Sequence, residues 1–448
     1  MGTFVPFSRD QSFLLPPDLK DWLPEDDVAH FVVAAVERVP LSAFQAKSAA
    51  GGKAQYHPRL MLALLVYCYA NGVFSSRRIE RATFRDIGVR FVAANLHPDH
   101  DTIAAFRRSN RAAFEAAFLR VLLLAREAGL LRVGNVAIDG TKIDANASKI
   151  RSVRYDRAAE LHAKLAADIA ALAARAEAAD SEGAPDPRAL PKEIARRGAL
   201  KAKLDAACAR LEAEARAEAE AARPAYEAKK AACDAKRGRR GGRPPKPPGG
   251  EPPPGRQSNL TDPDSALMRR SDAHEYRQAY NAQAVVCADG SQLILATDVA
   301  TTADAPGFAA AALAMEGTVG LPRAVLADTG FASGEAVAAL EARGIEPLVA
   351  IGRTRPHRPY DFRPPPKPKR ERRTTEPWRI AMQAKLDTPD AKALYARRKQ
   401  TVEPAFGIIK SAMGFVRFRL RGLRNAAAEW TLVALAYNCR RLHRMQAA

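Results

Sequence analysis

Residues 133–149 read VGNVAIDGTKIDANASK, and the rest of the chain is organised around this segment. Its apolar run from Val136 to Ile138 is typical of a short buried strand. Asp139 follows directly, just before a glycine, so we expect this carboxylate to end the strand. An ionised carboxylate beside a hydrophobic strand is costly unless a cation, hydrogen bonds or water meet it. The segment therefore indicates either the rim of an active site or a strand that ends in a solvated aspartate.

Charge is the most unusual property of the composition. The 448 residues, enough for two or three domains, carry a formal net charge of +20. Residues 351–448 alone contain 23 Lys and Arg against 7 Asp and Glu. Such an excess predicts a polyanionic partner, because each cation set against a phosphate also releases a counterion. The five scattered cysteines, the lack of a signal pattern and the lack of a long apolar run predict a cytoplasmic protein with reduced thiols.

Residues 1–132 are expected to form a helical N-terminal domain. Its arginines include Arg77, Arg78, Arg81, Arg85, Arg107, Arg108 and Arg111. Short helices with this many cations fit a DNA-binding, helix-turn-helix-like domain, but they also fit a helical bundle whose charges simply face water. The N-terminal domain is therefore a candidate DNA-binding domain without an assigned recognition helix.

The middle of the chain predicts an insertion. Residues 155–235 carry leucine stripes at helical spacing on either side of a Pro- and Gly-containing break, which indicates two antiparallel helices. This pair is either an arm for dimerisation or DNA binding, or a tolerated insertion. Residues 236–277 are expected to be a basic linker, because the stretch 236–256 is too rich in Pro, Gly and charge to pack.

Alternating strands and helices are expected on both sides of the insertion. Residues 133–154 would form the first part of an α/β core, and residues 278–448 the remainder with basic C-terminal helices. In the second part, Asp289-Gly290 indicates a hairpin, and residues 324–327 form a short apolar strand that ends at Asp328. A helix at 335–343, a strand at 347–351, a basic loop at 353–373 and helices at 395–413 and 430–445 would follow.

Three acids in these segments suggest metal chemistry. Asp139 and Asp328 at strand ends and Glu403 on a helix could together hold two Mg²⁺ ions, because Mg²⁺ prefers oxygen ligands and two such ions support phosphoryl transfer. Lys399 and Lys410 would share roughly the face of Glu403. For that helix alone, an amphipathic helix with an internal ion pair is an equally open interpretation.

The residues also carry a family resemblance. VAIDGTKIDANASK, AVLADTGFAS and YARRKQTVEPAFGIIK resemble the three acidic motifs of DDE transposases from bacterial insertion sequences, in the branch with a Tyr-Arg-Glu-Lys signature around the third acid. YNAQAVV and YHPRLMLALLVYCYANGVFSSRRIE are similar to the same group, so the resemblance spans most of residues 56–441. It implies an RNase H-like mixed-sheet catalytic core interrupted by a helical insertion. It also implies Mg²⁺-dependent strand cleavage and joining, with Mn²⁺ as a substitute.

Further expectations follow from this resemblance residue by residue. Asp139, Asp328 and Glu403 match the metal-binding triad, and Lys410 matches the lysine seven residues after the glutamate. Two more positions of the signature, Tyr395 and Arg398, have the right mutual spacing but sit one residue early. Counting back from the glutamate puts Lys399 at the arginine position, so DNA contact is expected of Tyr395, Arg398, Lys399 and Lys410. Asp144, five residues after Asp139, is an alternative first acid.

The sequence thus predicts a nucleoid-associated transposase that cleaves insertion-sequence ends and joins the 3′-hydroxyl to target DNA. Its partners would be double-stranded DNA, at element ends and target, and further copies of itself, as a homodimer or higher oligomer. Two alternatives remain open. One is an RNase H-like metal-dependent nuclease that does not join strands, and the other is a non-cleaving DNA-binding protein derived from a transposase.

Overall fold

The computed structural model divides into two compact units, which we describe separately. Unit 1 combines residues 1–143 with 280–448, and unit 2 comprises residues 144–279. The structure describes residues 18, 21, 23–45, 55–182, 189–235, 245–269, 275–301, 307–352 and 376–446. The basic loop expected at 353–373 and the first part of the expected linker, residues 236–244, lie outside the described residues.

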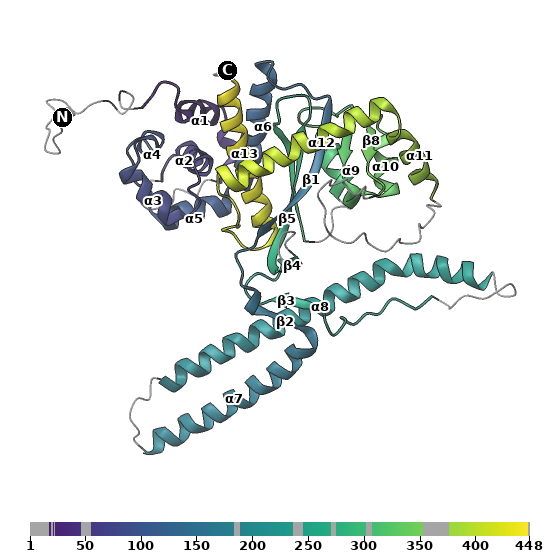
Figure 1. The fold of residues 1–448 in the computed structure, drawn as a ribbon. Coiled ribbons are helices and arrows are strands. Elements are labelled where there is room, and N and C mark those ends of the chain that lie inside the picture. Colours follow the sequence, from purple (N-terminus) through teal and green to yellow (C-terminus); the bar gives the residue numbers. More distant parts are fainter. Residues whose placement is uncertain are drawn as a thin grey trace, which may run out of the picture. The chain divides into compact units, whose positions relative to one another are not determined.

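Unit 1 begins with a helical part (Figure 1). Its helices are α1 (Val28–Glu37), α2 (Pro58–Ala70), α3 (Ser76–Arg85), α4 (Ile87–Val92), α5 (His100–Ser109) and α6 (Arg111–Glu127). Side chains of Asp27, Asp86 and Asp99 cap α1, α4 and α5 by accepting hydrogen bonds from the first backbone N–H groups. Helix α2 starts with a proline and is buried from Met61 to Ala70, which makes it the central helix of this part.

Five strands of a six-stranded mixed sheet form the second part of unit 1. They are β1 (Asn135–Asp144), β5 (Tyr276–Cys287), β6 (Ile294–Ala300), β7 (Ala324–Ala327) and β8 (Glu346–Val349), in the order β6-β5-β1-β7-β8; the last residue of β1 and the first four of β5 belong to unit 2. Strand β7 is parallel to β1 and β8, whereas β5 and β6 are antiparallel. Ala288 N donates to Asn135 O at one end and Ala145 N to Gln278 O toward the other, so β1 and β5 are also antiparallel.

Short helices connect the parallel strands, as crossover connections require. Helix α9 (Phe308–Leu313) precedes β7, and α10 (Gly334–Glu341) lies between β7 and β8. Two more helices, α11 (Pro377–Leu386) and α12 (Pro389–Gly407), follow β8. The expected hairpin, strands and helices of this part are therefore present, with bounds shifted by a few residues.

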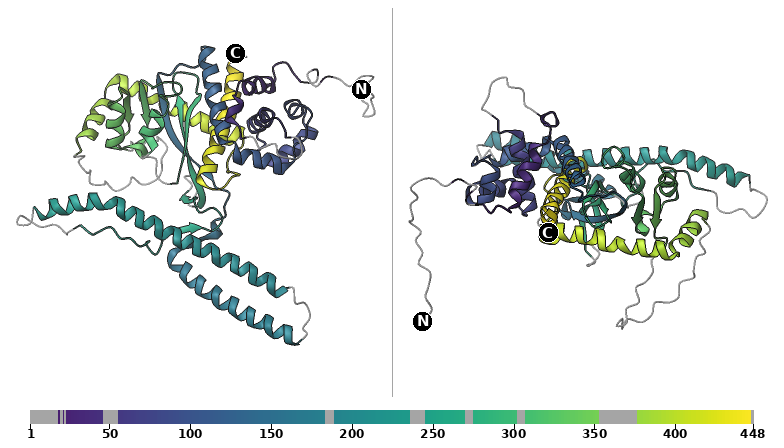
Figure 2. Two further views of the ribbon diagram at one scale, coloured as in Figure 1. Left: turned by 180° about the vertical axis from the view of Figure 1, so that it is seen from behind. Right: turned by 90° about the horizontal axis from the view of Figure 1, so that it is seen from above.

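Helix α13 (Leu423–Gln446) joins the helical part of unit 1 to the sheet (Figures 1 and 2). It packs against α6 and α2 on one side and β6 on the other, and its residues from Ala428 to Cys439 are buried. The side chain of Asn438 accepts from Ile294 N (2.9 Å) and donates to Ile294 O (2.8 Å). These two bonds satisfy the backbone N–H and C=O groups of Ile294 on the edge strand β6. On an exposed edge strand, such groups would be free to pair with other chains.

A buried polar network fixes α13 to α2 and α5. Tyr69 OH donates to Glu429 Oε1 (2.7 Å), and Arg107 Nη1 donates to Tyr69 OH (3.0 Å) and to Phe74 O (2.7 Å). The second oxygen of Glu429 accepts from the backbone N–H groups of Arg419 and Leu420. Burial acts to lower the pKa of Arg107, but Tyr69 and Glu429 outweigh it and raise that pKa overall. Arg107 therefore stays charged inside the protein.

This network corrects one expectation from the sequence. Arg107 was grouped with the arginines that could contact DNA, but it is 6% exposed and forms hydrogen bonds within the core. Its role is structural. Nothing in the spacing of the arginines distinguishes it from its exposed neighbours, because its partner Glu429 lies more than 300 residues away.

Unit 2 contains the predicted helical pair, α7 (Tyr155–Glu182) and α8 (Ala189–Asp234). Strands β2 (Ser152–Arg154) and β3 (Gln257–Asn259) pair at its base, and β4 (Ala266–Arg269) pairs with residues 276–279. The expectation that residues 236–277 are all linker is therefore wrong. Arg256 binds Glu214 and Glu218 on α8, so the described end of that segment packs because its charge has acidic partners.

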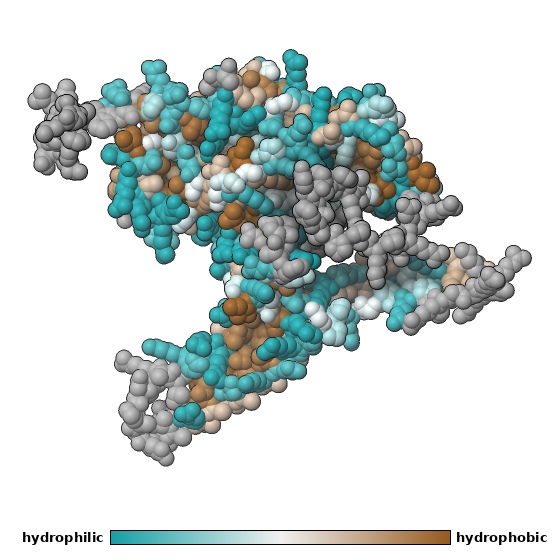
Figure 3. Space-filling model, viewed as in Figure 1, coloured by the Kyte–Doolittle hydropathy of each residue, from teal (hydrophilic) through white to brown (hydrophobic). Residues whose placement is uncertain are grey.

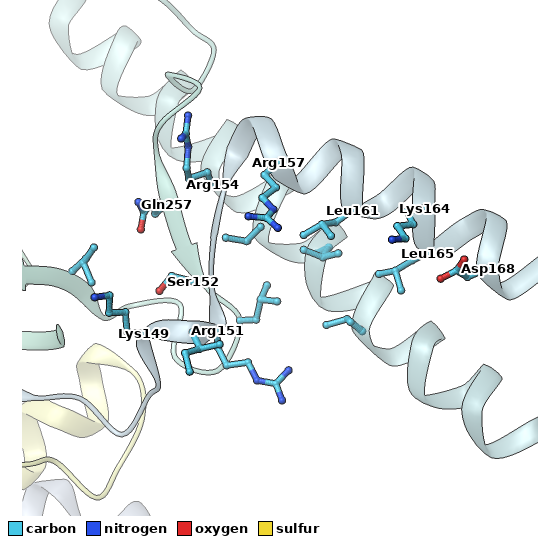
Figure 4. A pocket seen from close by; sticks show the side chains of 16 residues that line it. Lys149, Arg151, Ser152, Arg154, Arg157, Leu161, Lys164, Leu165, Asp168 and Gln257 are labelled. Atoms are coloured by element: carbon cyan, nitrogen blue, oxygen red, sulfur yellow. The ribbon is translucent and has the colours of Figure 1, made fainter. Parts of the chain in front are cut away.

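A pocket of about 770 Å³ lies between β2, β3 and the helical pair (Figure 4). Leucines of α7 and α8 supply its apolar lining, seen in Figure 3 as a brown patch between hydrophilic flanks. The cations around it are Lys149, Arg151, Arg154, Arg157 and Lys164. The two helices bury only part of their leucine stripes against each other, since Leu161 and Leu165 remain partly exposed.

No helix in the described ranges is long and apolar enough to cross a membrane.

The buried network makes a testable prediction about stability. Glu429→Gln should lower the free energy of unfolding by about 3 kcal/mol, because it leaves Arg107 as a buried charge without its carboxylate partner. Urea unfolding followed by tryptophan fluorescence measures this change. As a control, Glu115→Gln breaks an exposed ion pair with Arg111 and should change stability by less than about 0.5 kcal/mol. Equal effects of the two substitutions would show that the network does not stabilise unit 1.

Candidate functional site

Asp139 lies inside strand β1 and does not end it. The strand continues to Asp144 because Ile143 is buried and the backbone beyond the glycine stays extended. The expectation that Asp139 terminates the strand is therefore wrong. The neighbouring strand, however, is shorter. Ala137 pairs with Leu326, and β7 ends at Ala327, so Asp139 lies just past the point where its neighbour stops.

The second acid, Asp328, directly follows β7, as the sequence predicts. Its Oδ1 accepts a hydrogen bond from Gly330 N (2.8 Å) and caps a single turn at Thr329–Phe331. Extended by two residues, the parallel register of Ala137 with Leu326 would set Asp139 beside Asp328, and Asp328 lies close enough to raise the pKa of Asp139. Neighbouring strands lie about 4.8 Å apart, and residues in register point to the same face. The sheet itself therefore brings these two carboxylates together.

Helix α12 supplies a cation to this pair. Arg398 Nη1 lies 2.7 Å from Asp139 Oδ2, and both side chains are mostly buried, at 12% and 21% exposed. One turn earlier, Tyr395 OH donates to Ala327 O (3.1 Å), the last carbonyl of β7. Tyr395 and Arg398 share one face of the helix because they are three residues apart. The two contacts hold α12 over the ends of the strands that carry the acids.

The electrostatics of Asp139 reflect its neighbours. Burial raises the pKa of its carboxyl group, and the nearby Asp328 raises it further. Arg398 and the N–H of Gly140, which donates to Asp139 Oδ1 (2.8 Å), oppose this rise. Burial likewise raises the pKa of the Tyr395 hydroxyl. A buried carboxylate with a raised pKa, beside a second acid and a fixed cation, is the pattern of a candidate functional site.

Glu403 lies on α12, as predicted, but on a different face from Arg398. The buried residues of this helix include Val402 and Ala405, whereas Glu403 is exposed. At 100° per residue, Glu403 points about 140° away from Arg398 around the helix axis. In the ranges that the structure describes, no three His, Cys, Asp or Glu side chains come together as a metal site.

The end of α12 is irregular next to Glu403. Pro404 has no N–H, so the carbonyl of Gln400 lacks its usual helical partner and instead accepts from Gln292 Nε2 (2.9 Å). A π-helical segment, Ile408–Ala412, follows and contains Lys410. The argument that Lys410 shares a regular helical face with Glu403 therefore does not hold. Pro404 was the signal in the sequence for this irregularity.

The remaining candidates lie at separate positions. Lys399 is exposed on α12. Asp144, the alternative first acid, belongs to unit 2, where its Oδ2 lies 3.1 Å from Arg277 Nη1. Arg398 is the best placed of the expected DNA-contact residues, because it touches one of the acids directly.

The donor set fits one divalent cation of the Mg²⁺ type. Mg²⁺ is commonly held by one or two carboxylates and completes its shell with water and phosphate oxygens. Asp139 and Asp328 provide two such carboxylates, and burial raises the pKa of Asp139 although Arg398 opposes the rise. A site with all three acids is not assembled in the described residues.

Comparison with protein families gives two matches. Residues 255–439 match the Transposase DDE domain, and residues 17–109 match the family Transposase domain (DUF772). The first match contains Asp328, Tyr395, Arg398 and Glu403, while Asp139 lies outside both. No curated protein and no solved structure shows significant similarity to the chain. The two matches cover the sheet after the insertion and most of the N-terminal helices, and together they support a DDE transposase of the insertion-sequence kind.

Proposed function

We propose that this protein cleaves the ends of an insertion sequence and joins the freed 3′-hydroxyl to target DNA. The observation that carries this proposal is the pair Asp139, on β1, and Asp328, directly after the adjacent parallel strand β7, with Arg398 bound to Asp139. The two transposase matches support it independently of that geometry. The mixed sheet, with Asp139 inside β1 and Asp328 directly after the neighbouring β7, fits the RNase H-like core that the resemblance implies.

In this proposal the two aspartates bind a metal ion, and Arg398 compensates their charge. Asp139 and Asp328 would hold a divalent ion, which supplies Lewis-acid activation of the attacking hydroxyl and stabilises the leaving oxygen. Arg398 limits the repulsion between the two carboxylates and favours the ionised form of Asp139, since it opposes the rise in the pKa of that group. Its guanidinium has five donors in a rigid fork, so it can bind Asp139 and a phosphate oxygen together.

The assignment of the other residues extends this scheme. Glu403 is the proposed third carboxylate, which a second ion would need, and it would approach the pair by a rearrangement of α12 near Pro404. Lys399 on α12 and Lys410 in the π-helical segment after it are proposed to hold DNA phosphates. Action on paired ends by a homodimer or higher oligomer, and the use of Mg²⁺ or Mn²⁺, are parts of the same proposal.

The exposed position of Glu403 favours one second candidate. A chain whose third acid never reaches the pair would bind DNA without cutting it, as a non-cleaving DNA-binding protein derived from a transposase. Divalent-ion-dependent nicking separates this candidate from an enzyme. Joining of a pre-cleaved end then separates a transposase from a nuclease of similar core, which would nick but not join.

The carboxylate pair gives the first test of the proposal. Asp328→Asn should reduce cleavage of a duplex carrying the element end by about 1000-fold or more, because a metal site that contributes several kcal/mol to the transition state loses a charged ligand. DNA affinity should stay within about twofold. Gel-based cleavage and electrophoretic mobility assays measure the two quantities.

A matched control lies on α12. Asp390 is an exposed acid in its first turn, so Asp390→Asn removes one negative charge without touching the pair and should cleave normally. Normal cleavage by Asp328→Asn would remove this residue from the catalytic machinery.

Glu403 provides a separate test that distinguishes the two candidates. If the acid joins the pair during catalysis, Glu403→Gln should lose cleavage as severely as Asp328→Asn, with DNA binding kept. Single-turnover cleavage with Mg²⁺ and then Mn²⁺ measures the effect. Lys399→Gln, one turn away on a similar face, should weaken binding but leave the single-turnover rate at saturating DNA within about tenfold. Full activity of Glu403→Gln would show that Glu403 does not join Asp139 and Asp328 during cleavage.

A further inference from the structure

Helix α3 carries an arginine face on the surface of unit 1. Its buried residues are Ile79 and Thr83, which pack the helix against α4 and α5. The four exposed arginines Arg77, Arg78, Arg81 and Arg85 lie on the opposite side. At 100° per residue they fall within an arc of about 100°, centred roughly opposite the buried pair. We call these four residues the arginine face of α3.

Among the described residues, no acid forms an ion pair with this face. The helix has one acidic residue, Glu80, and its Oε2 lies 2.8 Å from His100 Nδ1, so it is engaged with α5. Within the described stretches, none of the four arginine side chains forms an ion pair or a hydrogen bond. Arg77, Arg81 and Arg85 repeat every four residues, a spacing at which like charges destabilise a helix by a few tenths of a kcal/mol per pair. An ordinary solvated helix face mixes both signs, whereas this one keeps an unfavourable arrangement.

The helix is rigidly mounted. Arg107 donates to Phe74 O (2.7 Å) and lies 3.4 Å from Ser76 Oγ, so the buried network fixes the start of α3. At the other end, Asp86 caps α4 by accepting from Val89 N (2.8 Å). The arginine face is therefore presented in a fixed direction, and a partner would not need to order it.

The structure also separates these arginines from the others in the same part of the chain. Arg107 is buried in the network, and Arg111 forms an ion pair with Glu115 (2.7 Å). The seven arginines named from the sequence thus do not form one basic surface. Four of them lie together on α3, within the residues matched as a Transposase domain.

We propose that the arginine face of α3 binds the backbone of double-stranded DNA. Guanidinium groups bind phosphates in bidentate fashion, and successive arginines spaced four residues apart advance about 6 Å along the helix. A ten-residue helix is about 15 Å long, and the major groove of B-DNA, about 12 Å wide, admits an α-helix. Figure 3 shows hydrophilic residues over this part of unit 1, at the lower left.

An apolar residue borders the arginine face. Phe84 is 57% exposed, and its ring stacks on His97 with ring centroids 3.9 Å apart. A fixed aromatic ring beside phosphate-binding arginines can contact the sugar or a thymine methyl group in the groove. This inference rests on the proposed function only in taking DNA as the substrate, because the binding surface and the carboxylate pair use different residues.

Salt dependence tests the inference directly. The variant Arg77→Gln/Arg81→Gln/Arg85→Gln should bind a 30-base-pair duplex at least tenfold more weakly than the unchanged chain. The slope of log affinity against log salt should also fall by about 2.7, since each lost phosphate contact removes about 0.9. Fluorescence anisotropy in EDTA measures both quantities without cleavage. Without DNA, the thermal midpoint should stay the same or rise slightly, because the substitutions remove repulsion.

The control removes the same charge elsewhere in unit 1. Arg38→Gln/Arg126→Gln/Arg424→Gln changes three exposed arginines, one just after α1 and the others on α6 and α13, and its slope should fall by less than 1. Equal slopes for the two triple variants would overturn the inference. It would also be overturned if the α3 triple variant lost binding to polyglutamate, a non-nucleic polyanion, but bound DNA as the unchanged chain does. Either result would leave the catalytic proposal standing if Asp328→Asn still abolishes cleavage. If the salt slope of the α3 triple variant falls as expected but Asp328→Asn still cleaves DNA, only the catalytic assignment is overturned.

Discussion

The parallel register between β1 and β7 is the constraint on which the candidate site depends. It carries Asp139 and Asp328 to the same edge of the sheet, although 188 residues separate them in the chain. Two carboxylates held this way repel each other, and burial adds to the cost for Asp139. Arg398 offsets part of this cost from α12. The remaining imbalance is the physical reason to expect a cation at this place.

The rest of unit 1 keeps that register in place. Helix α13 covers the edge strand β6 through Asn438 and is fixed to the helical part through Glu429. Tyr395 attaches α12 to the last carbonyl of β7, so the helix that carries Arg398 is positioned by the strand that carries Asp328. The buried charges therefore serve two purposes: Glu429 and Arg107 hold the helices together, and Asp139 and Arg398 shape the site.

Much of this arrangement could be predicted from local sequence. The apolar runs before Asp139 and Asp328, the hairpin at Asp289-Gly290 and the helical pair of unit 2 all have short-range patterns that the structure reproduces. The continuation of β1 past Gly140 could not be predicted, because it depends on pairing with β5, which follows the insertion. The structural role of Arg107 could not be predicted either, because its partner Glu429 is also distant in the sequence. The exposed face of Glu403 depends on where α12 lies, and no local pattern contains that information.

If Asp139 and Asp328 form one cation site, a double-mutant cycle on Mn²⁺ binding will reveal their coupling. Calorimetric titration of the full chain would be compared with Asp139→Asn, Asp328→Asn and the double variant. If both acids hold one ion, either single change should remove most of the affinity, and the double variant should bind no more weakly than the worse single variant. Independent, additive losses, or unchanged Mn²⁺ affinity in either single variant, would contradict the account.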